Sequence, residues 1–137
     1  MFTSPNRLLA TAFGAFYIAV GLLGFTVSTG RDFFAAEGGL LLVLFELNAF
    51  QNIVHLVIGA VLLLCGLRSV GAARTANPVV GAFCLLLGLV GLFIIGSDAN
   101  ILAINGNDNV LHFGTAVVLL AAGLGADKHR VSAEPAG

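Results

Sequence analysis

Four apolar runs, each long enough to cross a lipid bilayer as a helix, dominate this sequence. A transmembrane helix takes about 20 apolar residues, and the runs cover roughly residues 8–26, 47–67, 78–96 and 108–125. Charged residues make up only 9% of the chain and apolar residues 58%. So few charges cannot cover the water-facing surface of a small soluble domain. We therefore predict an all-α integral membrane protein whose four-helix transmembrane domain covers residues 1–126.

Basic residues are concentrated on one side of the predicted spans. Five of the six lie before the first span, between the second and third, or after the fourth: Arg7, Arg68, Arg74, Lys128 and Arg130. Only Arg31 lies on the other side, together with five acidic residues. Because Lys and Arg concentrate in cytoplasmic loops, we predict a multi-pass protein of the plasma (inner) membrane with both termini in the cytoplasm.

The chain contains an internal repeat of two spans. The segment GAFYIAVGLLGF at 14–25 matches GAFCLLLGLVGL at 81–92, and LNAFQNIVHL at 47–56 matches INGNDNVLHF at 104–113. Each copy holds an even number of spans, so the two copies cross the membrane in the same direction. The repeat predicts a four-helix bundle made of two parallel helical hairpins.

Glycines recur at matched places in the first and third spans. Gly14 and Gly21 are seven residues apart, and Gly81 and Gly88 repeat that spacing. Residues seven apart lie on one face of a helix, and small residues let helix backbones approach closely in membranes. We expect this face to pack against another helix.

A polar stripe recurs in the second and fourth spans, at i, i+4 and i+7. Its members are Asn48, Asn52 and His55 in the first copy, and Asn105, Asn109 and His112 in the second. This spacing places each set on one face of a helix. Polar groups cannot face lipid cheaply, so we expect both stripes to point into the bundle, towards the axis and towards each other.

Three interpretations of the stripe remain open. In the first, Asn48 and Asn105 cap their helices and the other four side chains hydrogen-bond between helices. In the second, the stripe lines a binding site or a water-filled pathway open to the outside. In the third, His55 and His112 ligate haem iron or another metal across the axis. A tetrahedral metal would need two further ligands.

Some residues break the repeat or lie outside it. Asp108 occupies the position of Gln51, and we expect its charge to favour a helix N-terminus. Cys65 and Cys84 have no CxxC partner, so we interpret them as apolar packing residues.

Two segments are expected to lie outside the spans. The apolar segment 40–45, LLLVLF, is too short to span by itself, and we expect an interfacial helix or an early turn of a long second span. Residues 127–137 are polar, and we expect a mobile cytoplasmic tail.

The sequence says more about which functions this chain lacks than about which it has. The scattered basic residues form no stripe that could neutralise nucleic-acid phosphates. No nucleophile elbow, phosphate loop or HExxH motif occurs, so we predict no enzymatic activity and no required cofactor. The leading hypothesis is an accessory or interaction protein in the lipid bilayer, a subunit of a membrane complex or a homo-oligomer. The alternative is a protein that binds or transports a small molecule or a haem or metal cofactor through the Asn/His stripe.

The paired LN/IN-xxx-N-xx-H stripes and the repeated GLLGF and GLVGLF segments resemble a family of small bacterial four-helix membrane proteins, the domain of unknown function DUF4383. The resemblance covers residues from about Arg7 to Gly125. It implies the four-helix fold and brings no mechanism, because the family has no assigned activity. The family pattern often has a His where this chain has Gln51, so a role that needs a third imidazole does not carry over.

Overall fold

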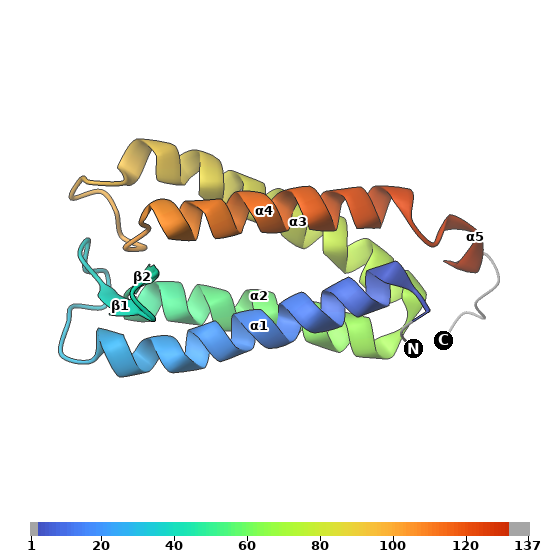
Figure 1. Cartoon of the computed structure of the whole chain (residues 1–137), viewed down its shortest axis with the longest axis horizontal. Helices are drawn as coiled ribbons and strands as arrows, with labels where there is room; N and C mark the ends of the chain where they lie inside the picture. The colour runs from blue at the N-terminus through green and yellow to red at the C-terminus, as the bar shows by residue number, and fades with distance from the viewer. Residues whose placement is uncertain (1–2, 132–137) are drawn as a thin grey trace.

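Four long helices account for most of the computed structural model, which describes residues 3–131 (Figure 1). They are α1 (Pro5–Ser28), α2 (Ala49–Arg68), α3 (Val70–Ile94) and α4 (Gly106–Gly125), and the short α5 (Lys128–Val131) follows. Each of the first four is long and apolar enough to cross a membrane. The predicted all-α, four-span fold is therefore confirmed, and the chain is a multi-pass membrane protein by the length and composition of its helices.

The connection between α2 and α3 is a single residue, Ser69. The Ser69 amide donates to the Cys65 carbonyl at the end of α2, and its hydroxyl accepts from the Ala72 amide at the start of α3. α3 therefore begins before Pro78, where we had expected the third span to start, and Pro78 lies inside the helix. Membrane helices tolerate an internal proline when neighbours compensate, and the Pro78 ring packs directly on Gly123 of α4.

The helices pack as two pairs, α1 along α2 and α3 along α4 (Figure 1). A Cβ at Gly14 would lie 2.9 Å from the carbonyl oxygen of Gly59, and a Cβ at Gly81 would lie 3.3 Å from that of Ala116. These two contacts are equivalent under the repeat, with offsets of 67 and 57 residues. The expected close packing of the glycine face is confirmed, and both hairpins use the same contact.

The segment that follows α1 forms a β-hairpin, so the expectation of an interfacial helix or an early turn of the second span was wrong. Strands β1 (Gly39–Leu41) and β2 (Phe45–Leu47) pair antiparallel, with Leu40 opposite Glu46. Leu42 and Val43 form the turn at φ 52° and 62°, a left-handed conformation that is uncommon for a β-branched residue. The sequence could not show this, because a short run of apolar residues without polar ones has no periodicity by which a helix can be told from a strand.

Glycines allow the hairpin to lie close to the end of α1. A Cβ at Gly39 would collide with the Val27 carbonyl, and a Cβ at Gly38 would lie 2.5 Å from the Leu47 carbonyl oxygen. Only glycine fits at position 39 against α1 and at position 38 against β2, and α2 begins after the hairpin at Ala49.

The start of α1 and the short α5 lie at the same end of the bundle, and the hairpin lies at the opposite end with the loop that joins α3 to α4 (Figure 1). We call the first the basic end, because Arg7, Arg68 and Lys128 lie there, and the second the acidic end. At the basic end Arg7 donates from Nε to the Gly66 carbonyl and from Nη2 to the Leu67 carbonyl. This side chain satisfies carbonyls that the end of α2 leaves unpaired.

Candidate functional site

The first polar residue of each stripe caps its helix, as in the first of the three interpretations. The Asn48 side-chain oxygen accepts from the Gln51 amide at 2.8 Å, and the Asn105 oxygen accepts from the Asp108 amide at 2.9 Å. In the reverse direction, Oδ2 of Asp108 accepts a hydrogen bond from the backbone amide of Asn105, which completes a capping box. Asp108 therefore lies in the first turn of α4, at the helix N-terminus where it was expected.

The side-chain amides of the same two residues bind the loops at the acidic end. Nδ2 of Asn48 donates to the carbonyls of Ala35 and Ile101, one in each loop. Nδ2 of Asn105 donates to the carbonyl of Leu44 in the hairpin turn. Each cap therefore also fixes the chain that covers the acidic end of the bundle.

The second residue of each stripe bonds to the other helix of its own hairpin. Nδ2 of Asn52 donates to the Ser28 hydroxyl on α1 at 3.0 Å, and Nδ2 of Asn109 donates to the Gly88 carbonyl on α3 at 3.0 Å. The opposing helix makes room with a glycine in both cases, since a Cβ at Gly24 or Gly91 would collide with the amide oxygen. These asparagines hold α1 to α2 and α3 to α4.

The two stripes do not face each other as expected, because only their histidines reach the axis of the bundle. The rings of His55 and His112 lie with their centroids 5.9 Å apart and their planes at 63°. Tyr17 and Cys84 are also repeat equivalents, and the Tyr17 hydroxyl lies 3.9 Å from the Cys84 sulfur. Equivalent residues that touch each other lie on the pseudo-two-fold axis, so these two pairs mark its course.

Gln51 and Asp108 extend the histidine pair towards the acidic end, and sequence reasoning did not include them in the site. Each lies one turn before a histidine on the same face, at i and i+4. All four side chains are fully buried. Gln51 and Asp108 occupy equivalent positions in the repeat, which could have pointed to a shared site. Because they are different residue types, they did not count as a repeated polar position. We call Gln51, His55, Asp108 and His112 the axial cluster.

Most polar atoms of the axial cluster have no hydrogen-bond partner within residues 3–131. These are Nε2 and Oε1 of Gln51, both ring nitrogens of His55 and of His112, and Oδ1 of Asp108. The expectation that the histidines hydrogen-bond between helices was therefore wrong, whereas the asparagines do so. A buried polar group without a partner costs about 1–3 kcal/mol, and such groups call for an explanation beyond packing.

The acidic end of the bundle covers the axial cluster. Oδ2 of Asp108 accepts from the backbone amide of Glu46 at 3.2 Å, which joins the hairpin to α4. The Glu46 carboxylate in turn accepts from the Gly38 amide at 2.7 Å. From the other loop, Leu102 and Ile104 are buried in the hydrophobic core. Access to the cluster from this end requires the cover to move.

The polar axis ends near the middle of the bundle. The Tyr17 hydroxyl hydrogen-bonds the Thr115 hydroxyl at 2.9 Å, one turn beyond His112. One turn further, Leu62 and Leu119 are fully buried and apolar. A continuous pathway would need polar groups at this level, so the arrangement is that of a closed site rather than of a channel.

The haem alternative does not fit this geometry. A macrocycle held by iron between His55 and His112 would extend beyond both rings on every side. Both imidazoles are fully buried, and the Tyr17 ring packs edge-on against His55 with centroids 5.3 Å apart. Within residues 3–131, no three or more His, Cys, Asp or Glu side chains are grouped so as to hold a metal ion.

A second buried polar network lies at the basic end, and sequence reasoning missed it. Nδ2 of Asn77 donates to the Asn6 side-chain oxygen at 2.8 Å, and Asn6 donates to the Ala122 carbonyl. The Asp127 carboxylate accepts from the Ser4 hydroxyl at 2.7 Å and from the Asn6 amide at 3.0 Å. The predicted polar tail thus begins with a contact to the start of α1. Residues 132–137 of that tail lie outside the described residues.

The two cysteines are both free. Cys84 is fully buried within the hydrophobic core, and Cys65 is half-buried near the end of α2. Their surroundings agree with the interpretation as packing residues.

The comparisons with known proteins identify a family and no activity. The family model described as "Domain of unknown function (DUF4383)" matches residues 7–125, which is the extent of the resemblance seen in the sequence. No curated protein and no solved structure matches the chain.

Proposed function

For this chain, which belongs to the DUF4383 family, we propose that it is a membrane protein that binds a small polar molecule at the axial cluster. The observation that carries the proposal is the set of buried, unpartnered polar atoms on Gln51, His55, Asp108 and His112. Ionisable groups inside a membrane protein are rare and are associated with function. A molecule that both donates and accepts hydrogen bonds would satisfy these atoms.

The chemistry of the ligand follows from the groups around it. Each imidazole offers two ring nitrogens, and a carboxamide offers both a donor and an acceptor. At the acidic end the hairpin, rather than lipid, covers the buried cluster, because the Glu46 amide donates to Asp108. The ligand therefore enters from the acidic end and is small, polar and rich in hydroxyl, amide or similar groups.

The test is to identify what the protein carries from its own membrane. Extraction of purified wild-type protein followed by mass spectrometry should yield one small polar compound at about one per chain. The double variant His55→Leu/His112→Leu should lack it. Asn77→Leu is the matched control, since it removes a buried polar side chain of the other network and should retain the compound. Absence of any such compound from the wild type, or equal amounts in all three proteins, would contradict the proposal.

The accessory or interaction role expected from the sequence stays a prediction, as does the absence of enzymatic activity. Exposed large apolar side chains occur on all four long helices. Lipid-facing helices have this property everywhere, so no single face is favoured for a protein partner.

We also propose that the basic end faces the cytoplasm of the plasma membrane. Arg7, Arg68 and Lys128 lie at this end, at the start of α1, the end of α2 and the start of α5, which agrees with the bias of Lys and Arg towards cytoplasmic loops. Reporters fused to either terminus should both be active in the cytoplasm, and activity outside would contradict this orientation.

A further inference from the structure

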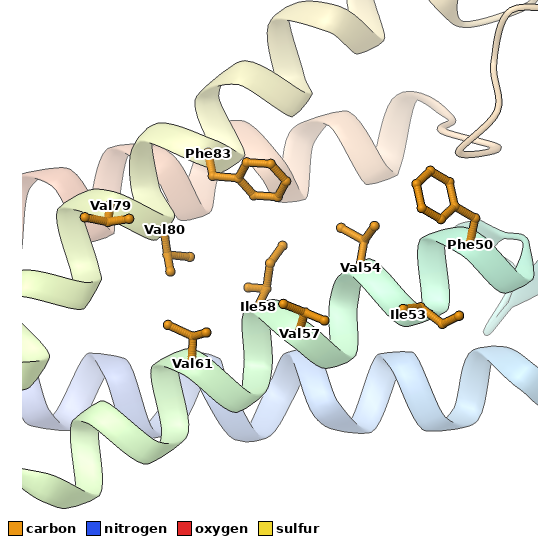
Figure 2. A pocket seen from close by; sticks show the side chains of 9 residues that line it. All are labelled: Phe50, Ile53, Val54, Val57, Ile58, Val61, Val79, Val80 and Phe83. Carbon is orange, nitrogen blue, oxygen red and sulfur yellow. The ribbon is translucent and has the colours of Figure 1, made fainter.

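A groove of about 500 Å³ opens between α2 and α3 (Figure 2). Every side chain that lines it is a valine, isoleucine or phenylalanine, six of them on one face of α2 and three on α3. Figure 2 shows Val54 and Ile58 directed into the space from α2, with Phe83 directed into it from α3. The groove exists because α2 and α3 meet at Ser69 and then diverge as each packs on its own hairpin partner (Figure 1).

The groove is open at the side of the bundle. Its floor contains the buried residues Ile58 and Val80, whereas Val57 and Val79 at its edges are 58% and 63% exposed. Since both helices are apolar enough to span a membrane, this side faces hydrocarbon. An occupant must therefore be apolar and must enter from the bilayer, as an acyl chain does.

Arg68 lies on the same face of α2 as the groove, towards the basic end. It follows Val61 by seven residues, which is two turns or about 10 Å along the helix. The side chain is exposed and makes no hydrogen bond or ion pair within residues 3–131. Neither α2 nor α3 contains an acidic residue, so the groove face presents a cation with no competing carboxylate.

The length of a lipid matches the distance from Arg68 to the groove. One leaflet contributes about 15 Å of hydrocarbon, half of the bilayer core. At 1.5 Å per residue this corresponds to about 10 residues of helix. A chain that starts at the level of Arg68 therefore reaches Ile58, and it occupies the half of the groove lined by Ile58, Val61 and Val80.

We propose that this groove binds one acyl chain of an anionic phospholipid from the leaflet at the basic end, with the lipid phosphate bound by Arg68. Basic side chains between transmembrane helices favour anionic headgroups, at about 1 kcal/mol per Lys or Arg near the surface, or about fivefold in affinity. The chain supplies apolar contact in the groove, and the guanidinium supplies the headgroup preference. This site is separate from the axial cluster and does not depend on its ligand.

Native mass spectrometry of the full chain with two phospholipids tests the proposal. The probes are phosphatidylglycerol and phosphatidylcholine with identical acyl chains, supplied in equal amounts. The wild type should retain one phosphatidylglycerol about fivefold more often than phosphatidylcholine. Arg68→Gln should bring the two retentions close to equal. Arg31→Gln, at the acidic end, should preserve the preference.

A second pair of variants tests the groove itself. Val61→Phe/Val79→Phe should fill it and lower retention of both lipids, whereas Val117→Phe on the exposed face of α4 should leave retention unchanged. Equal retention of the two lipids by the wild type would overturn the proposal, and so would an equal effect of Arg68→Gln and Arg31→Gln. A dimer that Val61→Phe/Val79→Phe dissociates would also overturn it, because a second copy would then cover the groove.

Discussion

Asn52 and His55 lie one turn apart on α2, but only Asn52 has a partner within the described chain. Its Nδ2 donates to the Ser28 hydroxyl on α1 and its Oδ1 has no partner, whereas both ring nitrogens of His55 are unpartnered. The equivalent residues Asn109 and His112 differ in the same way. The spacing in the sequence correctly placed asparagine and histidine on inward-facing surfaces. It could not show that the asparagine turns to its own hairpin while the histidine reaches the axis, because that depends on how the hairpins meet.

The glycines that face the two asparagines give a prediction about stability. Gly24→Ala and Gly91→Ala place a methyl group against the amide of Asn52 or Asn109, so each should lower the free energy of unfolding by about 1–3 kcal/mol. Gly114→Ala is the control, since nothing lies within 4 Å of its Cβ position, and it should be neutral or stabilising. Denaturant unfolding in detergent micelles measures all three. Equal stability of Gly24→Ala and Gly114→Ala would refute the close contact.

Among the elements, the helices could be predicted from sequence and the hairpin could not. Hydropathy and the asparagine caps placed the start of α2 and of α4 within two residues of 47 and 108. The pattern LLLVLF carries no strand period, and its folding depends on Gly38 and Gly39 meeting α1 and β2. The contact of Asp127 with Asn6 joins residues 121 positions apart, so no local pattern could indicate it.

The bond from the Glu46 amide to Asp108 gives a prediction for the cover. Asp108→Ala removes the acceptor for both Glu46 and Asn105 and should expose these two amides. A buried donor left without its acceptor costs about 1–3 kcal/mol, so their hydrogen exchange should quicken about fivefold or more. Asp98→Ala, a change in the exposed loop, is the control and should leave both rates unchanged. Unaltered exchange in Asp108→Ala would show that Asp108 does not hold the hairpin.

In the whole molecule, the repeated polar residues fall into two groups, those that hold each hairpin together and those of the axial cluster. Positions 48, 52, 105 and 109 hold each hairpin and its loops together through hydrogen bonds. The axial cluster lies where the two hairpins face each other, and the layer of Leu62 and Leu119 closes it towards the basic end. Removing a side chain that makes a buried hydrogen bond destabilises a fold, whereas replacing one that makes none with an apolar group of similar shape is neutral or stabilising.

The most direct test is to compare leucine substitutions of the asparagines that hold the hairpins with leucine substitutions of the axial histidines, in ligand-free protein. Asn52→Leu and Asn109→Leu keep a branched side chain but lose the hydrogen bonds to Ser28 and Gly88, and each should lower the free energy of unfolding by about 1–3 kcal/mol. His55→Leu and His112→Leu should leave it unchanged or raise it. If the histidine variants lost as much stability as the asparagine variants, the histidines would be structural, and the axial cluster would not be a binding site.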